Sequence, residues 1–315
     1  MNRGALDHRA QAPASATRRV AIVTESTCCL PTELAQRHGI AILPIPYTLG
    51  EAEYRDGVDL TRARFYELLQ ATRAVMRTSP PSPGEYLDAW RRADARGEDI
   101  LTISVDGSIS TMSRSTHIAL RLAPSALPQA RIEVVDSHSA GMGQGFVALA
   151  AARLAATGAP LSAVVAEAQR VASRVQLVVA LDTLDYLARS SRIPQVAAII
   201  GGMLSIRPVF AMGASGLHVL ARPRTRSRSI ARVLEQVRAA VPEGARLHAA
   251  VQHACAEREA AELEQAIRQS YDCAELYTTE FTPVMGGYCG PGLLGVAFYH
   301  DDPASTPVVP DGTHD

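Results

Sequence analysis

VAIVTESTCCLPTELAQRHGIAILPIPYT, residues 20–48, is the stretch that decides the fold. Val20–Val23 predicts a short buried strand, Leu30–His38 a helix and Ile40–Thr48 a second strand. A strand, a helix and a strand joined by short connections are typical of a parallel sheet, because parallel strands need a crossover between them. The stretch therefore predicts an α/β fold.

The alternation continues along the chain. In the first half it predicts helices over Leu60–Thr72, Pro83–Arg96, Thr111–Leu122 and Gly143–Ala156, and strands over Ile100–Ser104 and Ile132–Val135. In the second half it predicts helices over Leu161–Arg174, Thr183–Arg189, Pro194–Gly201, Ser227–Ala240 and Ala256–Gln269, and strands over Gln176–Leu181, Ser205–Phe210, Leu247–Gln252 and Leu293–Tyr299.

The change in element lengths near Gly158 predicts a boundary between two lobes. We expect two α/β lobes with parallel-type sheets, over residues 19–158 and 159–300, and a ligand site in the cleft between them. The polar leader, residues 1–18, and the tail rich in proline and acid, residues 301–315, are expected to be disordered.

Composition excludes several classes of function. A net charge of −1 over 315 residues argues against general nucleic-acid binding. The chain contains no lysine, which excludes a Schiff-base lysine and a Walker-type phosphate lysine. Five cysteines without metal-type spacing predict reduced thiols. Residues 1–18 are polar and lack the apolar segment of a secretory signal, and no apolar run approaches the length of a membrane span. We therefore expect a soluble cytoplasmic protein without a metal.

Two hydroxyl-rich turns, residues 78–82 and 108–113, lie where the apolar pattern breaks off. Serine and threonine hydroxyls donate and accept hydrogen bonds, so a cluster of them can hold a carboxylate or phosphate. Neither turn is accompanied by the residues that would make it catalytic. The two turns favour binding of a ligand with an anionic head.

Two other motifs have ordinary structural explanations. The sequence Gly141-Met142-Gly143-Gln144-Gly145 lacks the G-x-G-x-x-G spacing of a dinucleotide turn and favours close packing of a helix against the sheet. Asp136-Ser137-His138 cannot form a catalytic triad, because adjacent residues at a strand end point in different directions. Asp136 is expected to cap a helix or to bind backbone amides.

Three further features are candidates for anion or partner contacts. Arg192, which lies before an apolar stretch, could make a forked contact with a bound anion. Tyr288 stands in the glycine-rich turn Gly286–Gly292, and its tip is expected to point into the cleft. A basic run is either a solvated turn or a docking surface for a protein or an anion: Arg222, Arg224, Arg226 and Arg228.

In chain order, from about Val20 to Tyr299, these segments resemble the DegV family of bacterial fatty-acid-binding proteins. The resemblance rests on Thr24-Glu25-Ser26-Thr27, Thr78-Ser79-Pro80-Pro81-Ser82, Ile109-Ser110-Thr111, Val135-Asp136-Ser137, Gly141-Met142-Gly143, Ser191-Arg192-Ile193, Leu204-Ser205-Ile206-Arg207-Pro208 and Gly290-Pro291-Gly292-Leu293-Leu294-Gly295.

The resemblance implies a two-lobed protein that encloses one long-chain fatty acid in an apolar tunnel, with no cofactor. In the family, the threonine of the T-S-x-P-S turn and the serine of the L-S-G turn hold the carboxylate. By this correspondence Thr78 and Ser110 hold the carboxylate, and Tyr288 stands near the headgroup. With Ser79, Thr111 and Arg192, these are the expected ligand-binding residues. Such proteins present the fatty acid to a separate ATP-dependent fatty acid kinase and carry away the acyl phosphate. The basic run would then serve as the kinase docking surface or as a transient membrane-surface contact.

This chain departs from the family pattern at four positions. Glu25 replaces an aspartate, Thr111 replaces the glycine of the L-S-G turn, Ser191 replaces a glycine, and Tyr288 stands where many members have a histidine. Two other functions remain open. One is a serine-dependent hydrolase or phosphotransferase acting on a small acylated or phosphorylated substrate in the same cleft. The other is a regulatory module in which the lipid is only structural.

Overall fold

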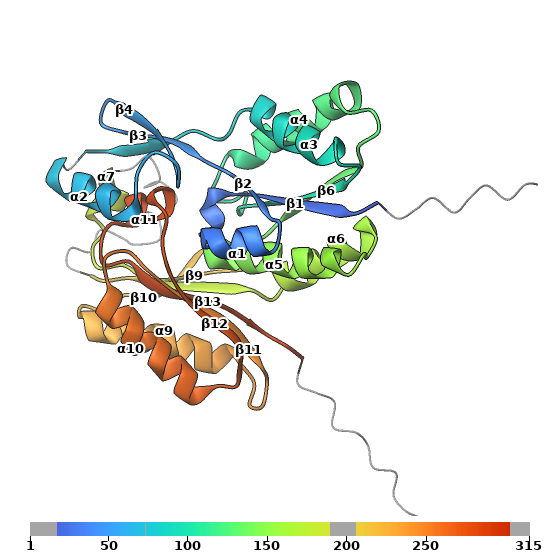
Figure 1. Cartoon of the computed structure of the whole chain (residues 1–315). Coiled ribbons are helices and arrows are strands. Elements are labelled where there is room, and N and C mark those ends of the chain that lie inside the picture. Colours follow the sequence, from blue (N-terminus) through green and yellow to red (C-terminus); the bar gives the residue numbers. More distant parts are fainter. Residues whose placement is uncertain (1–17, 73, 190–205, 303–315) are drawn as a thin grey trace, which may run out of the picture.

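The computed structural model describes residues 18–72, 74–189 and 206–302 (Figure 1). The predicted helix Pro194–Gly201 lies outside these ranges, as do residues 1–17 of the leader and 303–315 of the tail. Within the described ranges, no helix is long and apolar enough to cross a membrane.

Sheet A is the parallel sheet that the first segment predicted. Its strands, in spatial order, are β2 (Ala41–Leu43), β1 (Val20–Glu25), β6 (Asp99–Ser104) and β7 (Ile132–Asp136). The 3-10 turn and helices of this part of the chain are η1 (Ser26–Cys28), α1 (Thr32–Arg37), α3 (Pro83–Asp94), α4 (Met112–Ala126), α5 (Met142–Ala156) and α6 (Leu161–Ala172).

Strand β1 is buried on both faces, which explains its nearly continuous apolar sequence. Ala21 and Val23 pack in a cluster with residues of α3 and α4, whereas Val20 and Ile22 belong to the cluster that contains α5. Successive side chains of a strand point to opposite faces, so one short segment anchors both helical layers. Figure 1 shows these layers above and below the sheet.

The predicted strand Ile40–Thr48 is wrong as a single element. It divides into β2 of sheet A and β3 (Pro46–Leu49), which belongs to a separate antiparallel sheet B. Pro44 and Pro46 lack backbone N–H groups, so the chain cannot continue the ladder of sheet A beyond β2 as a regular strand. Two strands that the sequence analysis did not predict complete sheet B: β4 (Ala52–Arg55) and β5 (Met76–Thr78). Helix α2 (Arg62–Thr72) lies between them in the chain.

Sheet C forms the second lobe and corrects the expectation of parallel-type sheets in both lobes. Its strands, in spatial order, are β10 (His218–Ala221), β9 (Val209–Met212), β8 (Gln176–Ala180), β13 (Leu294–His300), β11 (Leu247–His253) and β12 (Cys273–Glu280). Only β11 and β12 pair in parallel, and the other four pairs are antiparallel. Strands β9 and β10 are joined by a short connection, which imposes antiparallel pairing. The C-terminal strand β13 enters between β8 and β11, a position that its place in the sequence does not reveal.

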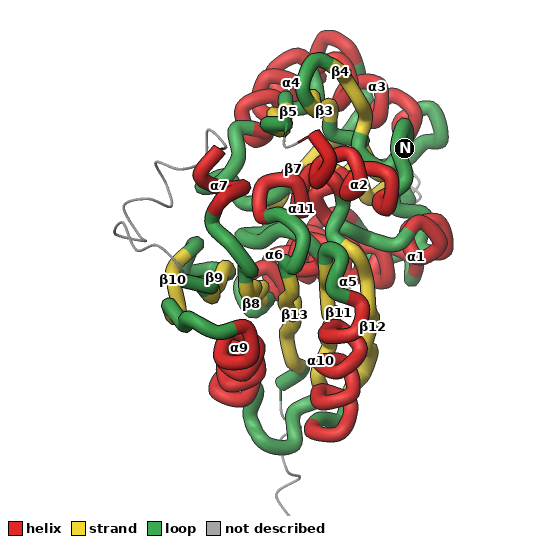
Figure 2. Tube along the Cα trace, turned by 90° about the vertical axis from the view of Figure 1, so that its left-hand side faces the viewer, coloured by secondary structure: helices red, strands yellow, loops and turns green. Residues whose placement is uncertain are grey.

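Helices α9 (Arg226–Ala240) and α10 (Glu257–Ser270) cover one face of sheet C (Figure 1). The remaining described helices, α7 (Asp185–Arg189) and α11 (Pro283–Cys289), lie beside each other, and α11 also contacts α2 (Figure 2). The predicted strand Ser205–Phe210 begins later, as β9, because Pro208 cannot donate to the ladder. Ser205 itself lies outside the described residues.

Helix α5 lies between the two large sheets and contacts β1 and β6 on one side and β8 and β13 on the other. Its residues from Met142 to Ala152 are all buried, as expected of a helix that is apolar on every side. A Cβ atom at Gly145 would lie 2.9 Å from the backbone oxygen of Cys28, so glycine permits the close approach of η1. Gly145 therefore serves close packing of α5 against η1, whereas the sequence analysis expected packing against the sheet.

An ion pair joins α5 to sheet C. Arg153 Nη1 donates to Glu275 Oε1 at 2.9 Å, and His248 and Tyr277 also contact this carboxylate. Burial alone would raise the pKa of Glu275, but these hydrogen bonds lower it to about 2.

Helix α6, which follows Gly158, packs against α5, β6 and β7. The division of the chain at Gly158 therefore stays a prediction.

Candidate functional site

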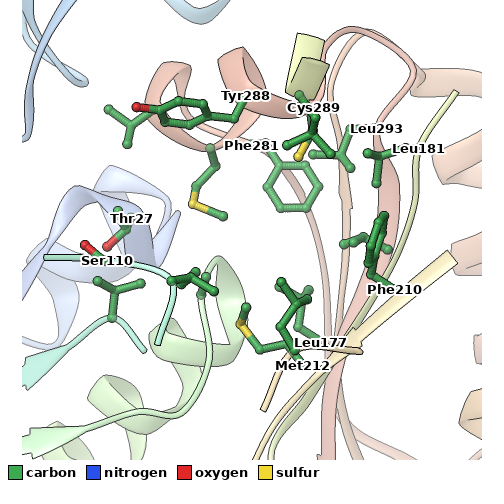
Figure 3. Close-up of a pocket in the computed structure, with 18 of the residues that line it drawn as sticks. Thr27, Ser110, Leu177, Leu181, Phe210, Met212, Phe281, Tyr288, Cys289 and Leu293 are labelled. Carbon is green, nitrogen blue, oxygen red and sulfur yellow. The ribbon is translucent and has the colours of Figure 1, made fainter. Parts of the chain in front are cut away.

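A cavity lies between sheet C, helix α11 and the loop that leads into α4, and its empty volume of about 1040 Å³ includes space that is open to solvent (Figure 3). Its described lining residues are Thr27, Val105, Ile109, Ser110, Met112, Ala140, Leu177, Val179, Leu181, Leu187, Phe210, Ala211, Met212, Leu217, Phe281, Val284, Met285, Tyr288, Cys289 and Leu293. Most of these side chains are apolar, as is typical of a site for an organic ligand.

Sheet C supplies one apolar wall of the cavity. Leu177 and Val179 alternate along β8 and face the cavity, whereas Val178 and Ala180 pack with α9 on the opposite face. The two-residue period of a strand produces this division. Phe210 and Met212 extend the wall from β9 (Figure 3). This wall offers no hydrogen bond and suits a hydrocarbon.

Three hydroxyl groups lie toward the other end of the cavity: those of Thr27, Ser110 and Tyr288 (Figure 3). Ser110 lies in the loop before α4, and its Oγ accepts a hydrogen bond from the backbone N–H of Met112 at 3.2 Å. Its own proton can still be donated to a ligand, because a hydroxyl is both donor and acceptor. Among the described residues that line the cavity, none is Arg or His.

Helix α11 places Tyr288 on the cavity wall. Val284, Met285, Tyr288 and Cys289 all line the cavity, and the spacing of four residues puts Val284 and Tyr288 on one helical face. The predicted glycine turn Gly286–Gly292 is thus wrong over its first half, which is helical. Gly290 and Gly292 have positive φ angles of 83° and 85° and form the turn that follows α11.

The two glycines inside α11 permit close packing. A Cβ atom at Gly286 would overlap the side chain of Tyr66 in α2, and one at Gly287 would overlap Met76 in β5. Tyr66 is held in place because its hydroxyl donates to the backbone oxygen of Phe281 at 3.1 Å. The glycines therefore set the distance between α11 and the N-terminal lobe, and with it the position of Tyr288.

The structure brings Thr78 and Tyr288 together. The Tyr288 hydroxyl lies 2.8 Å from Thr78 Oγ1 and accepts a hydrogen bond from the Thr78 backbone N–H at 3.1 Å. Tyr288 lines the cavity directly, whereas Thr78 is not among its described lining residues. Thr78 therefore contacts a residue of the cavity wall, Tyr288, and holds its hydroxyl in place.

The other predicted ligand residues are placed less centrally. Ser79 and Thr111 are exposed and do not appear among the described lining residues. Arg192 lies outside the described residues. Of the basic run, Arg222, Arg224 and Arg228 are exposed, whereas Arg226 is half-buried and paired with Glu259 at 2.6 Å. Arg226 is therefore held within the fold by α10.

A buried polar chain behind the cavity was missed by the sequence analysis. Thr27 Oγ1 donates to Gln144 Oε1 at 2.8 Å, and Gln144 Nε2 donates to Glu25 Oε2 at 2.7 Å. Glu25 also accepts from the Tyr86 hydroxyl at 2.7 Å. Burial raises the pKa of Glu25 to about 7, although these hydrogen bonds oppose the shift. The signal was a carboxyl group at the end of a strand that is otherwise almost entirely apolar.

The segment Asp136–His138 has the structural function that the sequence favoured. Asp136 Oδ2 accepts from the Gly107 backbone N–H at 3.0 Å, and its Oδ1 accepts from the His138 backbone N–H at 2.8 Å. The Ser137 hydroxyl is buried and donates to the Ser139 backbone oxygen. These three residues form no triad, and Asp136 binds backbone amides as predicted.

Comparison with known proteins was made by family, by sequence and by structure. The family described as "Uncharacterised protein, DegV family" matches residues 19–301. A DegV domain-containing protein of Streptomyces coelicolor is 34% identical over 282 residues, which cover 89% of this chain and 98% of that protein. Protein DegV of Bacillus subtilis is 28% identical over 280 residues, with the same coverage of both chains.

Two solved structures are similar over nearly the whole fold. A DegV family protein from Thermus thermophilus, described as binding fatty acid, and DegV of Bacillus subtilis, described as a fatty acid binding protein, each give a TM-score of 0.82 at 27% identity. Each match covers 90% of this chain and 100% of the other. The expected two-lobed α/β architecture is confirmed, and the chain belongs to the DegV family.

Proposed function

We propose that this protein binds one long-chain fatty acid in the cavity, with the hydrocarbon against sheet C and the carboxylate at the hydroxyl end. The observation on which this rests is the division of one cavity into an apolar wall and a cluster of hydroxyl groups. The relatives from Thermus thermophilus and Bacillus subtilis, described as binding fatty acid, support the choice of ligand.

The proposed headgroup site consists of hydroxyl donors. Ser110 and Tyr288 face the cavity, and Thr78 orients the Tyr288 hydroxyl. A buried carboxylate needs several donors to offset its lost hydration, and hydrogen bonds to a charged acceptor are stronger than neutral ones. Ser79, Thr111 and Arg192 remain candidate contributors, and Arg192 lies outside the described residues.

We further propose that the protein is a carrier rather than a catalyst. None of the cavity-lining residues that the structure describes is Asp, Glu or His, so Ser110 has no general base beside it there. The fatty acid would instead be presented, in the cytoplasm, to a separate fatty acid kinase that forms the acyl phosphate. The exposed residues Arg222, Arg224 and Arg228 are the candidate docking surface for this kinase or for a transient membrane contact.

Mass spectrometry of the purified protein tests the ligand. Under native conditions we expect a mass increase that corresponds to one fatty acid per chain, and after denaturation and extraction the free acid. The double variant Thr78→Ala and Ser110→Ala is expected to bind about 10- to 100-fold more weakly, because it lacks two hydroxyl groups near the charged headgroup. Affinity is measured by displacement of a fluorescent fatty acid.

Ser108→Ala is the matched control, since Ser108 lies in the same loop as Ser110 but is exposed. It should bind like the unmodified chain. If the double variant keeps full affinity, the headgroup assignment is wrong. If the protein neither retains nor takes up any fatty acid, the ligand class is wrong as well, and ester or phosphate turnover that is lost in Ser110→Ala would then point to a hydrolase.

A further inference from the structure

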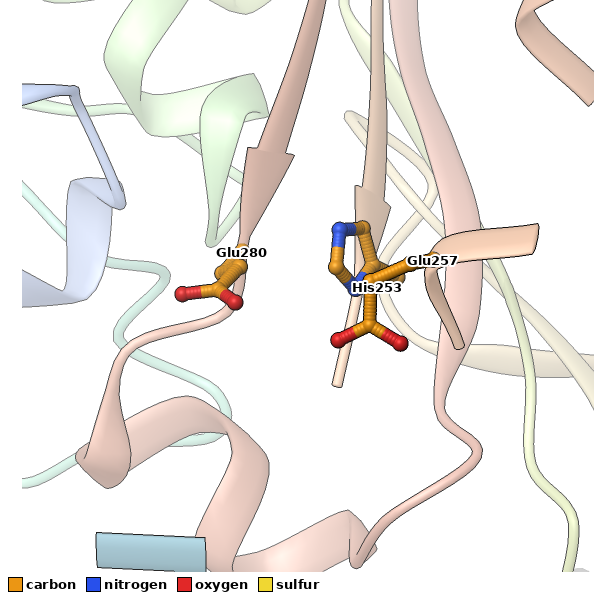
Figure 4. Close-up of side chains that lie close together, drawn as sticks. All are labelled: His253, Glu257 and Glu280. Atoms are coloured by element: carbon orange, nitrogen blue, oxygen red, sulfur yellow. The ribbon is translucent and has the colours of Figure 1, made fainter. Parts of the chain in front are cut away.

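Three metal-ligand side chains meet at one end of sheet C, outside the cavity (Figure 4). His253 ends β11, Glu280 ends β12, and Glu257 begins α10. One ligand atom from each lies within 4.8 Å of the others. His253 and Glu280 are direct partners in the parallel register of β11 and β12, so the backbone itself holds them side by side.

The histidine makes this cluster different from a group of surface acids. His253 is 5% exposed, and its Nδ1 atom has no hydrogen-bond partner. A buried polar atom without a partner costs about 1–3 kcal/mol, so native structures rarely retain one without a reason. The imidazole lies beside the carboxylates of Glu257 and Glu280 (Figure 4).

Each of the two carboxylates has another interaction that partly accounts for its position, whereas no hydrogen bond accounts for the buried Nδ1 atom of His253. Glu257 is in the first turn of α10, where a negative charge is favourable at the helix N-terminus. Glu280 Oε2 lies 3.9 Å from Arg62 Nη1, a long ion pair between side chains that are 41% and 30% exposed. Such pairs contribute little to stability. Neither contact satisfies His253.

We propose that His253, Glu257 and Glu280 form a binding site for a divalent transition-metal ion, with Zn²⁺ as the best match. One imidazole nitrogen and two carboxylate oxygens are a ligand set that zinc accepts, whereas Mg²⁺ and Ca²⁺ select oxygen alone. Glu257 is exposed and Glu280 is partly exposed, so the fourth position opens to solvent and takes water.

The ion would stabilise the segment that leads into the cavity. Glu280 directly precedes Phe281, a cavity-lining residue whose backbone N–H donates to the His253 backbone oxygen at 2.8 Å. An ion bound at the ends of β11 and β12 and at the start of α10 would link these three elements at the end of the sheet that lies next to Phe281. The folded chain would be stabilised in proportion to the ion's affinity.

The test uses the full chain without a polyhistidine tag, stripped with EDTA and titrated with ZnCl₂ in a calorimeter. We expect one Zn²⁺ per chain and a higher melting temperature when Zn²⁺ is present. Glu257→Gln and Glu280→Gln should each weaken binding at least tenfold, because each removes a charged ligand. Arg62→Gln should tighten binding a few-fold, because it removes a competing positive charge.

Glu262→Gln is the matched control, since Glu262 is an exposed carboxylate of α10 outside the cluster. It should bind Zn²⁺ like the unmodified chain, as should Cys255→Ser, which removes a nearby exposed thiol. Both ligand variants replace side chains at accessible positions, and equal melting temperatures without metal show that they fold. Absence of binding at 1 mM ZnCl₂, or affinity unchanged in the Glu257→Gln/Glu280→Gln double variant, overturns the proposal.

Discussion

Glu25 ends strand β1 with a carboxyl group that the fold buries completely. In the sequence, Glu25 follows four apolar residues and Thr24, and only the tertiary structure supplies its partners, Tyr86, Gln144 and the Val105 backbone N–H. Burial disfavours the charged carboxylate more than these donors favour it, and the pKa of Glu25 rises to about 7. Gln144 connects this carboxyl group to Thr27 on the cavity wall.

Glu25→Gln should remove a pH dependence of stability. The folded chain keeps a proton on Glu25 that the unfolded chain loses above about pH 4.5. The stabilisation of the folded chain by this group is therefore fully present below that pH and is lost as the pH rises through 7. Glutamine is neutral at every pH. Between pH 5 and 8 the free energy of unfolding of the unmodified chain should fall by up to ~3 kcal/mol more than that of the variant. Urea unfolding at each pH measures this difference.

The opposite result, parallel stability profiles for the two chains, would show that Glu25 is already ionised at pH 5. Asp56 must be considered as well, because burial also raises its pKa, to about 6, and it titrates in the same range. The difference between the profiles of the two chains, rather than the slope of either one, isolates Glu25.

At the scale of single elements, helix α11 shows how packing overrides local preference. Its seven residues include two glycines, and glycine in a helix interior costs about 1 kcal/mol relative to alanine. The sequence therefore favoured a turn. The helix forms because its glycine face fits against Tyr66 and Met76 while its other face lines the cavity.

Gly286→Ala should destabilise the protein by about 1–3 kcal/mol, because the added methyl group overlaps the hydrogen-bonded Tyr66 side chain. Displacement of α11 should also weaken fatty acid binding through Tyr288. Gly84→Ala in α3 is the matched control: its added methyl group would meet nothing closer than 3.8 Å, so the ordinary helix preference for alanine should stabilise it slightly. Thermal melting and ligand displacement measure both variants, and equal stability for the two would contradict the packing argument.

At the scale of the whole molecule, the cavity is assembled from segments that lie far apart in the sequence. The wall from β8 and β9 comes from the second lobe, Ser110 and Thr27 come from the first, and Tyr288 comes from α11. A ligand in the cavity therefore contacts both lobes. Its hydrocarbon should account for most of the affinity, and its carboxylate should set the orientation.

Fatty acid affinity should rise with chain length. Each buried methylene contributes roughly 0.8 kcal/mol, which corresponds to about a fourfold gain in affinity per carbon, until the apolar part of the cavity is filled. Displacement assays with saturated acids of increasing length would show this slope and its end. Methyl esters of equal length, which lack the charge, should keep the slope but bind more weakly at every length. If affinity did not change with the length of the acid, the hydrocarbon of the fatty acid would lie outside the cavity.

The sequence by itself determined the local elements and the residue types of the site. Alternating apolar segments predicted sheet A and most helices, because burial on one or both faces imposes a period that can be read directly. The hydroxyl-rich turns pointed to Ser110 and to Thr78, and the glycines around Tyr288 marked a place of close approach. These features depend on residues that are near one another in the chain.

Only the tertiary structure decided what depends on distant partners. The position of β13 between β8 and β11, the burial of Glu25 and the contact of Tyr288 with Thr78 all join residues far apart in sequence. The same holds for His253 and Glu280, which a strand register brings together. Each of these contacts is fixed by the packing of complete elements, and no local period or turn signal encodes which elements will meet.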